Sequence, residues 1–139
     1  MKLARIAGQA RYEQNKINHI VGDHDLDFDI RGMAGEIAAC KYFNVYPDLR
    51  IGPNRLGHDL KYKDLKIDVK CTKYTQGWLS VGLNHRPQSD FLYMLCCEVG
   101  REYTLVGWQW SETILQSSYQ TDRGYVMEQS MLKNIEEIK

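Results

Sequence analysis

The chain has 139 residues, 43% of them hydrophobic, and its 18 basic residues are balanced by 18 acidic ones. This length and composition predict one domain, residues 1–139, with enough apolar side chains to build a core. A formal net charge of zero excludes a general attraction to nucleic acid through overall charge, so any such attraction depends on how the charges are distributed.

Segments for membrane insertion and export are not found in the sequence. The longest strongly apolar run, Phe91 to Cys97, is far shorter than the roughly 18 residues that a membrane span requires. Met1 to Lys16 carries charges throughout and has no continuous apolar stretch, which argues against a secretory signal. We therefore expect a cytoplasmic protein that makes no contact with a membrane.

The cysteines and the overall pattern indicate no structural zinc and no organic cofactor. The four cysteines have no C-x-x-C spacing. Each falls in a segment that is predicted to be buried, where a free thiol behaves as a small hydrophobic group.

An acidic loop is the first clear feature. Residues 23–29 resemble a calcium-binding loop, but Phe28 stands where glycine is needed and Ala34 stands where a bidentate glutamate is needed. We therefore expect a solvated loop in which Asp27 or Asp29 caps the next helix.

An amphipathic helix is predicted between Gly32 and Asn44. Glu36 is expected near its N-terminal turn, where the helix dipole favours a carboxylate and where the side chain can face a metal ion or its water shell. The apolar positions that recur at helical spacing are Met33, Ile37, Cys40 and either Tyr42 or Phe43.

A β-hairpin is predicted next, because apolar residues alternate with charged ones from residue 59 to residue 71. The Lys63-Asp64 pair suits the turn. Strand parity places Asp68 and Lys70 on the face opposite the apolar residues Leu65, Ile67, Val69 and Cys71. A hairpin of this length brings Asp59 back near Asp68.

Two carboxylates that approach each other repel, unless a cation lies between them. A hard divalent ion with oxygen ligands, Mg²⁺ or Mn²⁺, removes that cost. Lys70 shares a face with Asp68, so its ammonium can reach an activated water or an attacked phosphate. This pattern predicts a metal-dependent hydrolytic site.

Further strands and helices complete an α/β domain. The run 90–99 is nearly continuous in apolar residues, as expected of a strand that is covered on both faces. Trp108 and Trp110 point one way and are expected in the core. The other predicted segments are strands at 78–83 and 102–110, a loop at 84–89, a helix that opens with Ser111 as N-cap, a mobile loop at 119–124, an extended piece at 125–127 and a closing helix at 130–138 with Leu132, Ile135 and Ile138 on one face.

The motifs Gly35-Glu36-Ile37-Ala38, Gly57-His58-Asp59-Leu60 and Ile67-Asp68-Val69-Lys70-Cys71-Thr72 resemble those of the PD-(D/E)XK nuclease superfamily. The likeness is greatest to its small phage-type and Holliday-junction-resolvase-like members, and it covers roughly residues 32 to 110. His58 stands where the motif has proline.

The resemblance implies a restriction-endonuclease-like fold, with a central mixed β-sheet flanked by helices. It also implies a Mg²⁺-dependent endo- or exodeoxyribonuclease that hydrolyses phosphodiester bonds in DNA. Asp59, Asp68, the Val69 carbonyl and Glu36 would bind the metal, and Lys70 would position or activate water. A phage-encoded member would work in the host cytoplasm.

Basic residues gather around these motifs. Between Arg50 and Lys73 there are seven basic residues against three acidic ones. We expect phosphate contacts from this region and from the loop at 84–89, although a solvated basic hairpin would have the same composition. The candidates for DNA binding are Arg55, Lys61, Lys63, Lys73 and Arg86.

A homodimer is expected, because cleavage of both strands of a duplex needs two sites and the chain is small. The helix predicted at residues 7–20 has few apolar anchors, so it would lie on the surface or contact a second subunit.

Two bland interpretations remain open at the level of sequence. A D-x-K pattern also occurs on solvated strand faces, and Glu36 could be an ordinary acid near a helix start. A catalytically silent module of the same fold, which binds nucleic acid or a protein partner, is the alternative function. An enzyme that cuts RNA by the same chemistry is a further one.

Overall fold

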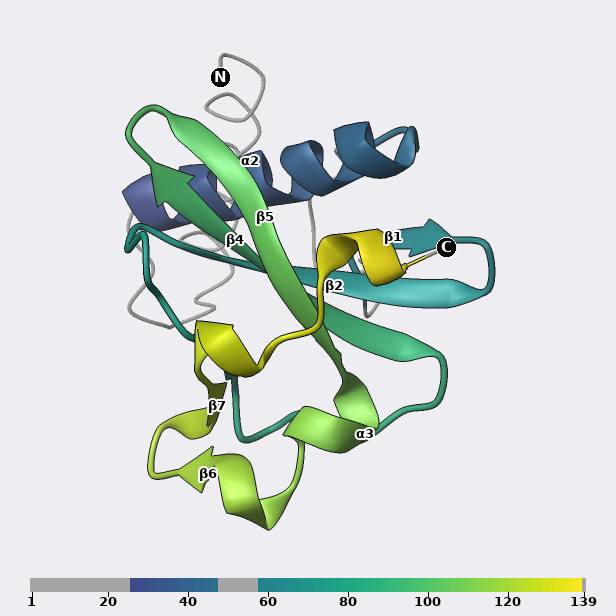
Figure 1. Ribbon diagram of the computed structural model, residues 1–139, viewed down its shortest axis with the longest axis vertical. Helices are drawn as coiled ribbons and strands as arrows, with labels where there is room; N and C mark the ends of the chain where they lie inside the picture. Colours follow the sequence, from purple (N-terminus) through teal and green to yellow (C-terminus); the bar gives the residue numbers. More distant parts are fainter. Residues whose placement is uncertain (1–25, 48–57, 139) are drawn as a thin grey trace, which may run out of the picture.

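A four-stranded mixed sheet with the order β1-β2-β4-β5 lies at the centre of the fold (Figure 1). The structure is a computed structural model that describes residues 26–47 and 58–138. The protein is of the mixed α/β class that the sequence predicts. β1 (Leu60–Tyr62) is antiparallel to β2 (Leu65–Thr72), β2 is parallel to β4 (Phe91–Val99), and β4 is antiparallel to β5 (Glu102–Trp110).

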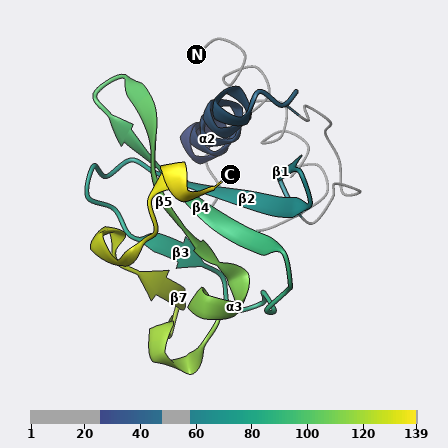
Figure 2. The ribbon, with the colours of Figure 1, turned by 45° about the vertical axis from the view of Figure 1, so that its right-hand side comes forward.

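Helix α2 and a second, smaller sheet cover opposite faces of the central sheet (Figure 2). The smaller sheet has the order β3-β7-β6. Its strands are short, and a helix of one turn, α3, lies beside it. The bounds are α2 Leu26–Phe43, β3 Leu79–Val81, α3 Ser111–Ile114, β6 Gln120–Thr121 and β7 Gly124–Met127.

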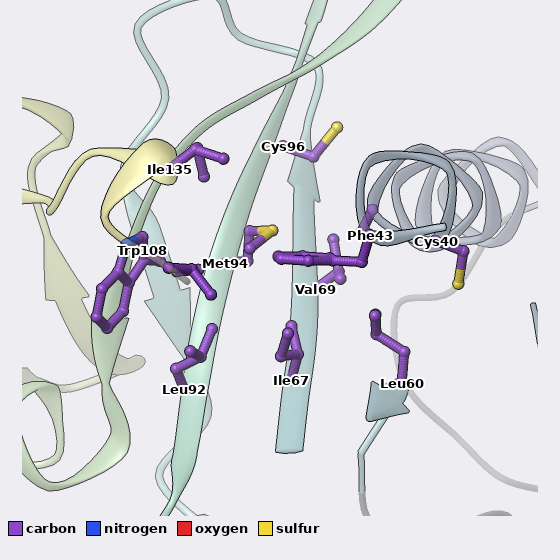
Figure 3. Packing of buried hydrophobic residues seen from close by; sticks show 12 residues of the cluster. Cys40, Phe43, Leu60, Ile67, Val69, Leu92, Met94, Cys96, Trp108 and Ile135 are labelled. Carbon is purple, nitrogen blue, oxygen red and sulfur yellow. The ribbon is translucent and has the colours of Figure 1, made fainter. Parts of the chain in front are cut away.

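Strand β4 is buried on both faces, as its apolar run predicts. Leu92, Met94 and Cys96 pack on the side of α2, whereas Tyr93 and Leu95 pack against the smaller sheet. Figure 3 shows Phe43 extending from α2 toward Val69 and Met94. The two core layers therefore meet at one strand, which fixes β2 and its charged residues relative to α2.

The predicted hairpin and the two long strands are confirmed. β1 and β2 are joined at Lys63-Asp64, and Lys63 takes a left-handed conformation with φ 54°. Ile67 and Val69 are buried on the α2 side, while Asp68 and Lys70 remain partly exposed. Trp108 is a core residue, 4% exposed, and it packs edge-on against Trp110.

Helix α2 begins earlier than the sequence predicts. Asp27 and Asp29, expected as caps, lie inside the helix, because the helical hydrogen-bond pattern already runs from Leu26. Glu36 consequently lies in the middle of α2 and not near its N-terminal turn, so the helix dipole does not account for a carboxylate at this position. Phe43 is buried, whereas Tyr42 is half exposed.

The C-terminal segment differs from prediction. No closing α-helix forms over residues 130–138, where the chain makes two 3₁₀ turns, Gln129–Met131 and Ile135–Glu137. Lys133 instead exchanges backbone hydrogen bonds with Trp108 of β5, at 3.1 and 2.9 Å. This pairing sends Leu132 toward one core cluster and Ile135 toward the other, which a single helix face could not do.

Two local predictions are also wrong. Ser111 does not cap α3: it is the first helical residue, it is fully buried, and its hydroxyl accepts a hydrogen bond from the Gln88 amide at 3.1 Å. The segment 119–124 is not an open loop, because Gln120 and Thr121 pair with β7.

Four free cysteines are present, and Cys40, Cys96 and Cys97 are buried while Cys71 is partly so. Across residues 26–47 and 58–138, no helix combines the length and apolarity needed to cross a membrane. The helix predicted at residues 7–20 and Arg55 lie outside the described residues.

Candidate active site

Asp59 lies immediately before β1, at the edge of the central sheet. Its backbone amide donates to the Ile67 carbonyl at 2.9 Å, and its carboxyl Oδ2 accepts from the Val69 amide at 2.7 Å. The β1-β2 ladder ends at the Leu60–Ile67 pair. The Asp59 side chain therefore supplies the acceptor that a longer β1 would have given to Val69.

Asp68 meets Asp59 across this edge. The two carboxyl groups are hydrogen-bonded to each other. Burial raises the pKa of Asp59 well above its usual range, and the charges of Asp68 and Glu36 raise it further. The Val69 amide opposes this shift, but the repulsive and desolvation contributions are larger.

Lys70 completes the charged face of β2. Its ammonium lies 3.2 Å from Asp68 Oδ2, and the side chains are 32% and 15% exposed, respectively. A salt bridge with this exposure stabilises a fold by at most about 1 kcal/mol, so stability alone does not account for the pair. The contact keeps the ammonium beside the two carboxyl groups.

Glu36 approaches from α2 and is 6% exposed. Glu36 lies close to Asp59, because its charge contributes to raising the pKa of Asp59. It also acts on the pKa of the Cys40 thiol, one turn later in the helix. Burial, followed by the charges of Glu36 and Asp59, raises the pKa of Cys40 to about 11. Glu36, Asp59 and Asp68 therefore form one acidic cluster.

Gly35 makes this approach possible. A Cβ atom at position 35 would lie 3.0 Å from the Cys71 Cβ and 3.4 Å from a Val69 methyl group. The absence of a side chain lets α2 lie directly on β2 at this point. The residue that follows, Glu36, is thereby brought to the level of the sheet edge.

The donor set fits a hard divalent cation. Asp59 and Asp68 offer carboxylate oxygens, and a cation between them would remove the repulsion that raises the pKa of Asp59. Because a strand residue directs its amide and carbonyl toward the same neighbour, the Val69 carbonyl faces the edge that Asp59 occupies. Among the residues described, no three His, Cys, Asp or Glu side chains already form a metal-binding group. Mg²⁺ needs fewer than three protein side chains, since it commonly binds through one or two carboxylates and keeps several waters.

The basic residues predicted to bind DNA are mostly on the surface. Lys61, Lys63 and Lys73 are exposed, and the ammonium groups of Lys63 and Lys73 lie 5.3 Å from the ring centres of Tyr62 and Tyr74. Lys61 and Lys63 belong to the hairpin that carries Asp59 and Asp68. This places positive charge along the edge beside the acidic cluster.

Arg86 is exposed, but part of its guanidinium is engaged within its own loop. Nη1 donates to the carbonyls of Leu83 and His85, at 3.3 and 3.1 Å. Arg86 therefore shapes the loop between β3 and β4, and its side chain is exposed.

Sequence reasoning missed Tyr93, and for His85, in the loop at 84–89, it weighed a substrate contact but favoured a polar surface residue. Tyr93 is the register partner of Asp68 on the neighbouring strand, and the Asp68 charge contributes to raising its pKa to about 12, after burial. His85 stacks on the Tyr93 ring. The alternation of β2 and β4 could have suggested the Asp68–Tyr93 pairing, but only the folded loop reveals the position of His85.

Comparison of the chain with protein-family models, with curated proteins and with solved structures finds no match.

Proposed function

We propose that this protein is a metal-dependent nuclease of the PD-(D/E)XK type, with a restriction-endonuclease-like fold, which hydrolyses phosphodiester bonds in DNA with Mg²⁺ or Mn²⁺. One observation carries the proposal: Glu36, Asp59, Asp68 and Lys70 come from a helix, a strand end and a strand, and they meet at one sheet edge. The sequence motifs that resemble the superfamily are the ones that supply these residues.

In this proposal Asp59, Asp68 and the Val69 carbonyl hold the cation, and Glu36 completes the acidic cluster. The bound cation would lower the pKa of an attacking water and neutralise charge on the phosphate. The Val69 amide holds Asp59 in place through the 2.7 Å hydrogen bond, so this carboxylate needs little reorganisation on binding.

Lys70 orients the reacting groups. Asp68 holds its ammonium at 3.2 Å and engages one of its three N–H donors, which leaves two donors for a water molecule and a phosphate oxygen. A positively charged donor in this place stabilises the negative charge that develops during in-line attack. Lys61 and Lys63 lie along the same hairpin, where they can bind phosphates of the substrate backbone.

A panel of substrates tests the proposal. The protein is incubated with supercoiled, linear, branched and single-stranded DNA, and with RNA, in Mg²⁺, Mn²⁺ or EDTA. We expect cleavage of DNA in the divalent cations and none in EDTA. A mobility shift without cleavage would favour the silent binding module, and cleavage of RNA alone would change the substrate class.

Variants assign the activity to the site. Asp68→Asn and Lys70→Ala should each abolish cleavage and leave the circular dichroism spectrum unchanged, because both side chains are partly exposed and neither belongs to the core. Asp122→Asn, in the exposed turn between β6 and β7, is a matched control for the loss of one carboxylate. Undiminished cleavage by both site variants would remove the assignment.

We also propose that the active form is a homodimer, because one small subunit presents one acidic cluster. Light scattering at micromolar concentration measures this directly. A monomer that nevertheless cleaves both strands of a duplex in one binding event would contradict it.

A further inference from the structure

The loop between β3 and β4 approaches the acidic cluster from the side of the sheet opposite α2. α2 brings Glu36 from one side of the central sheet, whereas Tyr93 belongs to the core cluster on the other side. His85 stacks on Tyr93 with ring centroids 5.9 Å apart and planes 17° apart. Because Tyr93 is in register with Asp68, this stacking sets the imidazole beside the charged face of β2.

The charges of Lys70 and Asp68 act on the imidazole of His85. The Lys70 ammonium acts to lower the pKa of His85 and the Asp68 carboxylate acts to raise it, although burial makes the largest contribution and lowers it. Both Lys70 and Asp68 therefore lie within electrostatic reach of the imidazole. Within the part of the chain that the structure describes, neither ring nitrogen of His85 makes a hydrogen bond.

The loop is fixed on both sides of His85. The His85 backbone amide donates to the Gly82 carbonyl at 3.3 Å. Further along, the Gln88 amide donates to the Ser111 hydroxyl at 3.1 Å, and this hydroxyl is also hydrogen-bonded to buried Tyr93. His85 is thus held by its ring face, while the edge of the ring, which carries the nitrogens, has no hydrogen-bond partner among residues 26–47 and 58–138.

We propose that His85 donates a hydrogen bond to a non-bridging phosphate oxygen of the substrate, beside Lys70, and that it is a substrate-contacting residue of this site. The proposal rests on the proposed function for the identity of the substrate. A restrained N–H donor within electrostatic reach of an ammonium and a carboxylate suits an anion that Lys70 also binds. Stacking on Tyr93 restrains the ring before the substrate arrives, so little side-chain entropy is lost on binding.

Three substitutions separate the donor from the stacked ring. His85→Phe keeps an aromatic ring on Tyr93 and removes both nitrogens. His85→Asn removes the ring but retains an N–H donor. His85→Ala removes both, and Gln88→Ala, an exposed side chain in the same loop, is the control.

Two measurements are made on each variant: binding of a fluorescent DNA oligonucleotide in EDTA at low salt, and steady-state cleavage in Mg²⁺. We expect His85→Phe to behave like His85→Ala, with a rise in Kd and a fall in kcat/KM of about 10- to 100-fold, the range for a lost hydrogen bond to a charged group. His85→Asn should recover part of the loss, and Gln88→Ala should match the wild type.

The outcomes distinguish this inference from the proposed function. Wild-type binding and cleavage by His85→Phe would overturn the inference, because the ring would then serve only packing. If the wild type binds DNA without cleaving it, and His85→Phe loses that binding while His85→Asn keeps part of it, the contact stands and the nuclease function fails. Absence of DNA binding by the wild type would overturn both.

Discussion

The carboxyl of Asp59 accepts a hydrogen bond from the Val69 amide at 2.7 Å, one step beyond the last residue pair of the β1-β2 ladder. A side chain thus replaces a backbone acceptor at the edge of the sheet. The replacement carries a negative charge into a place where Asp68 and Glu36 already act on it. Such an arrangement opposes folding unless a cation is bound, which makes the cluster testable by stability as well as by activity.

Asp59→Asn should stabilise the metal-free protein at neutral pH. Asn keeps an oxygen for the Val69 amide, and its amide can donate to Asp68. Because the pKa of Asp59 is raised in the folded state, that state holds the proton more tightly than the unfolded chain, where the pKa is about 3.9. The contribution of this group to the free energy of unfolding is fully present below about pH 4 and is lost as pH rises through the raised pKa.

Thermal melts in EDTA check this prediction. Asp59→Asn should melt several degrees above the wild type at pH 7.5, and the difference should shrink as the pH is lowered toward 4. Asp122→Asn, exposed in the β6–β7 turn, should show no such trend. A variant that melts below the wild type at pH 7.5 would indicate that the carboxylate stabilises the empty site.

Addition of Mg²⁺ should raise the melting temperature of the wild type, since a ligand that binds only the folded state stabilises it. At a concentration 100 times the Kd the gain is about 2.7 kcal/mol. Asp59→Asn and Asp68→Asn should lose most of this shift, whereas Asp64→Asn in the exposed hairpin turn should retain it. Equal shifts in all variants would place the ion elsewhere.

Gly35→Ala should harm both the fold and the site. The added Cβ meets the Cys71 Cβ at 3.0 Å, and this atom is not the end of a flexible side chain, so we expect α2 and β2 to shift apart by a few tenths of an ångström. Overpacking of this kind costs about 1–3 kcal/mol, and the movement displaces Glu36. Urea denaturation measures the first effect and Mg²⁺-dependent cleavage the second.

Gly32→Ala is the matched control in the same helix. A Cβ at position 32 has no neighbour within 4 Å. Alanine should therefore stabilise α2 by about 0.5–1 kcal/mol and leave cleavage unchanged. Equal behaviour of the two alanine variants would contradict the close approach at Gly35.

Lys61→Ala and Lys63→Ala should weaken DNA binding in a way that depends on salt. Each phosphate contact that is lost should reduce the slope of log K against log salt by about 0.9 on duplex DNA. Lys133→Ala, at β5 on the far edge of the sheet, should leave the slope unchanged. Titrations by fluorescence anisotropy at several salt concentrations give the slopes, and an unchanged slope for Lys61→Ala would remove that residue from the interface.

The sequence predicted the parts of the fold that depend on local pattern. Alternation defined β2, and the continuous apolar run defined β4, because burial on one or two faces leaves a direct mark on residue order. The same alternation placed Asp68 and Lys70 on one face. The meeting of Asp59 and Asp68 followed from the length of the hairpin.

Other features depend on contacts between distant residues, which a local pattern does not encode. The level of Glu36 relative to the sheet depends on the contact of Gly35 with Cys71. The tail contains helix-like spacing, yet pairing of Lys133 with Trp108 prevents a helix there. The position of His85 depends on stacking against a residue of β4.

The brevity of β1 has one last consequence. The three residues of β1, at an outer edge of the sheet, make few backbone hydrogen bonds, whereas β4 pairs with a strand on each side. Hydrogen–deuterium exchange should therefore be fast at β1 and slowest at β4, since small local openings are enough to release an edge. The edge of the sheet that carries Asp59 can thus rearrange without global unfolding, and substitutions there can accumulate while the centre of the molecule stays intact.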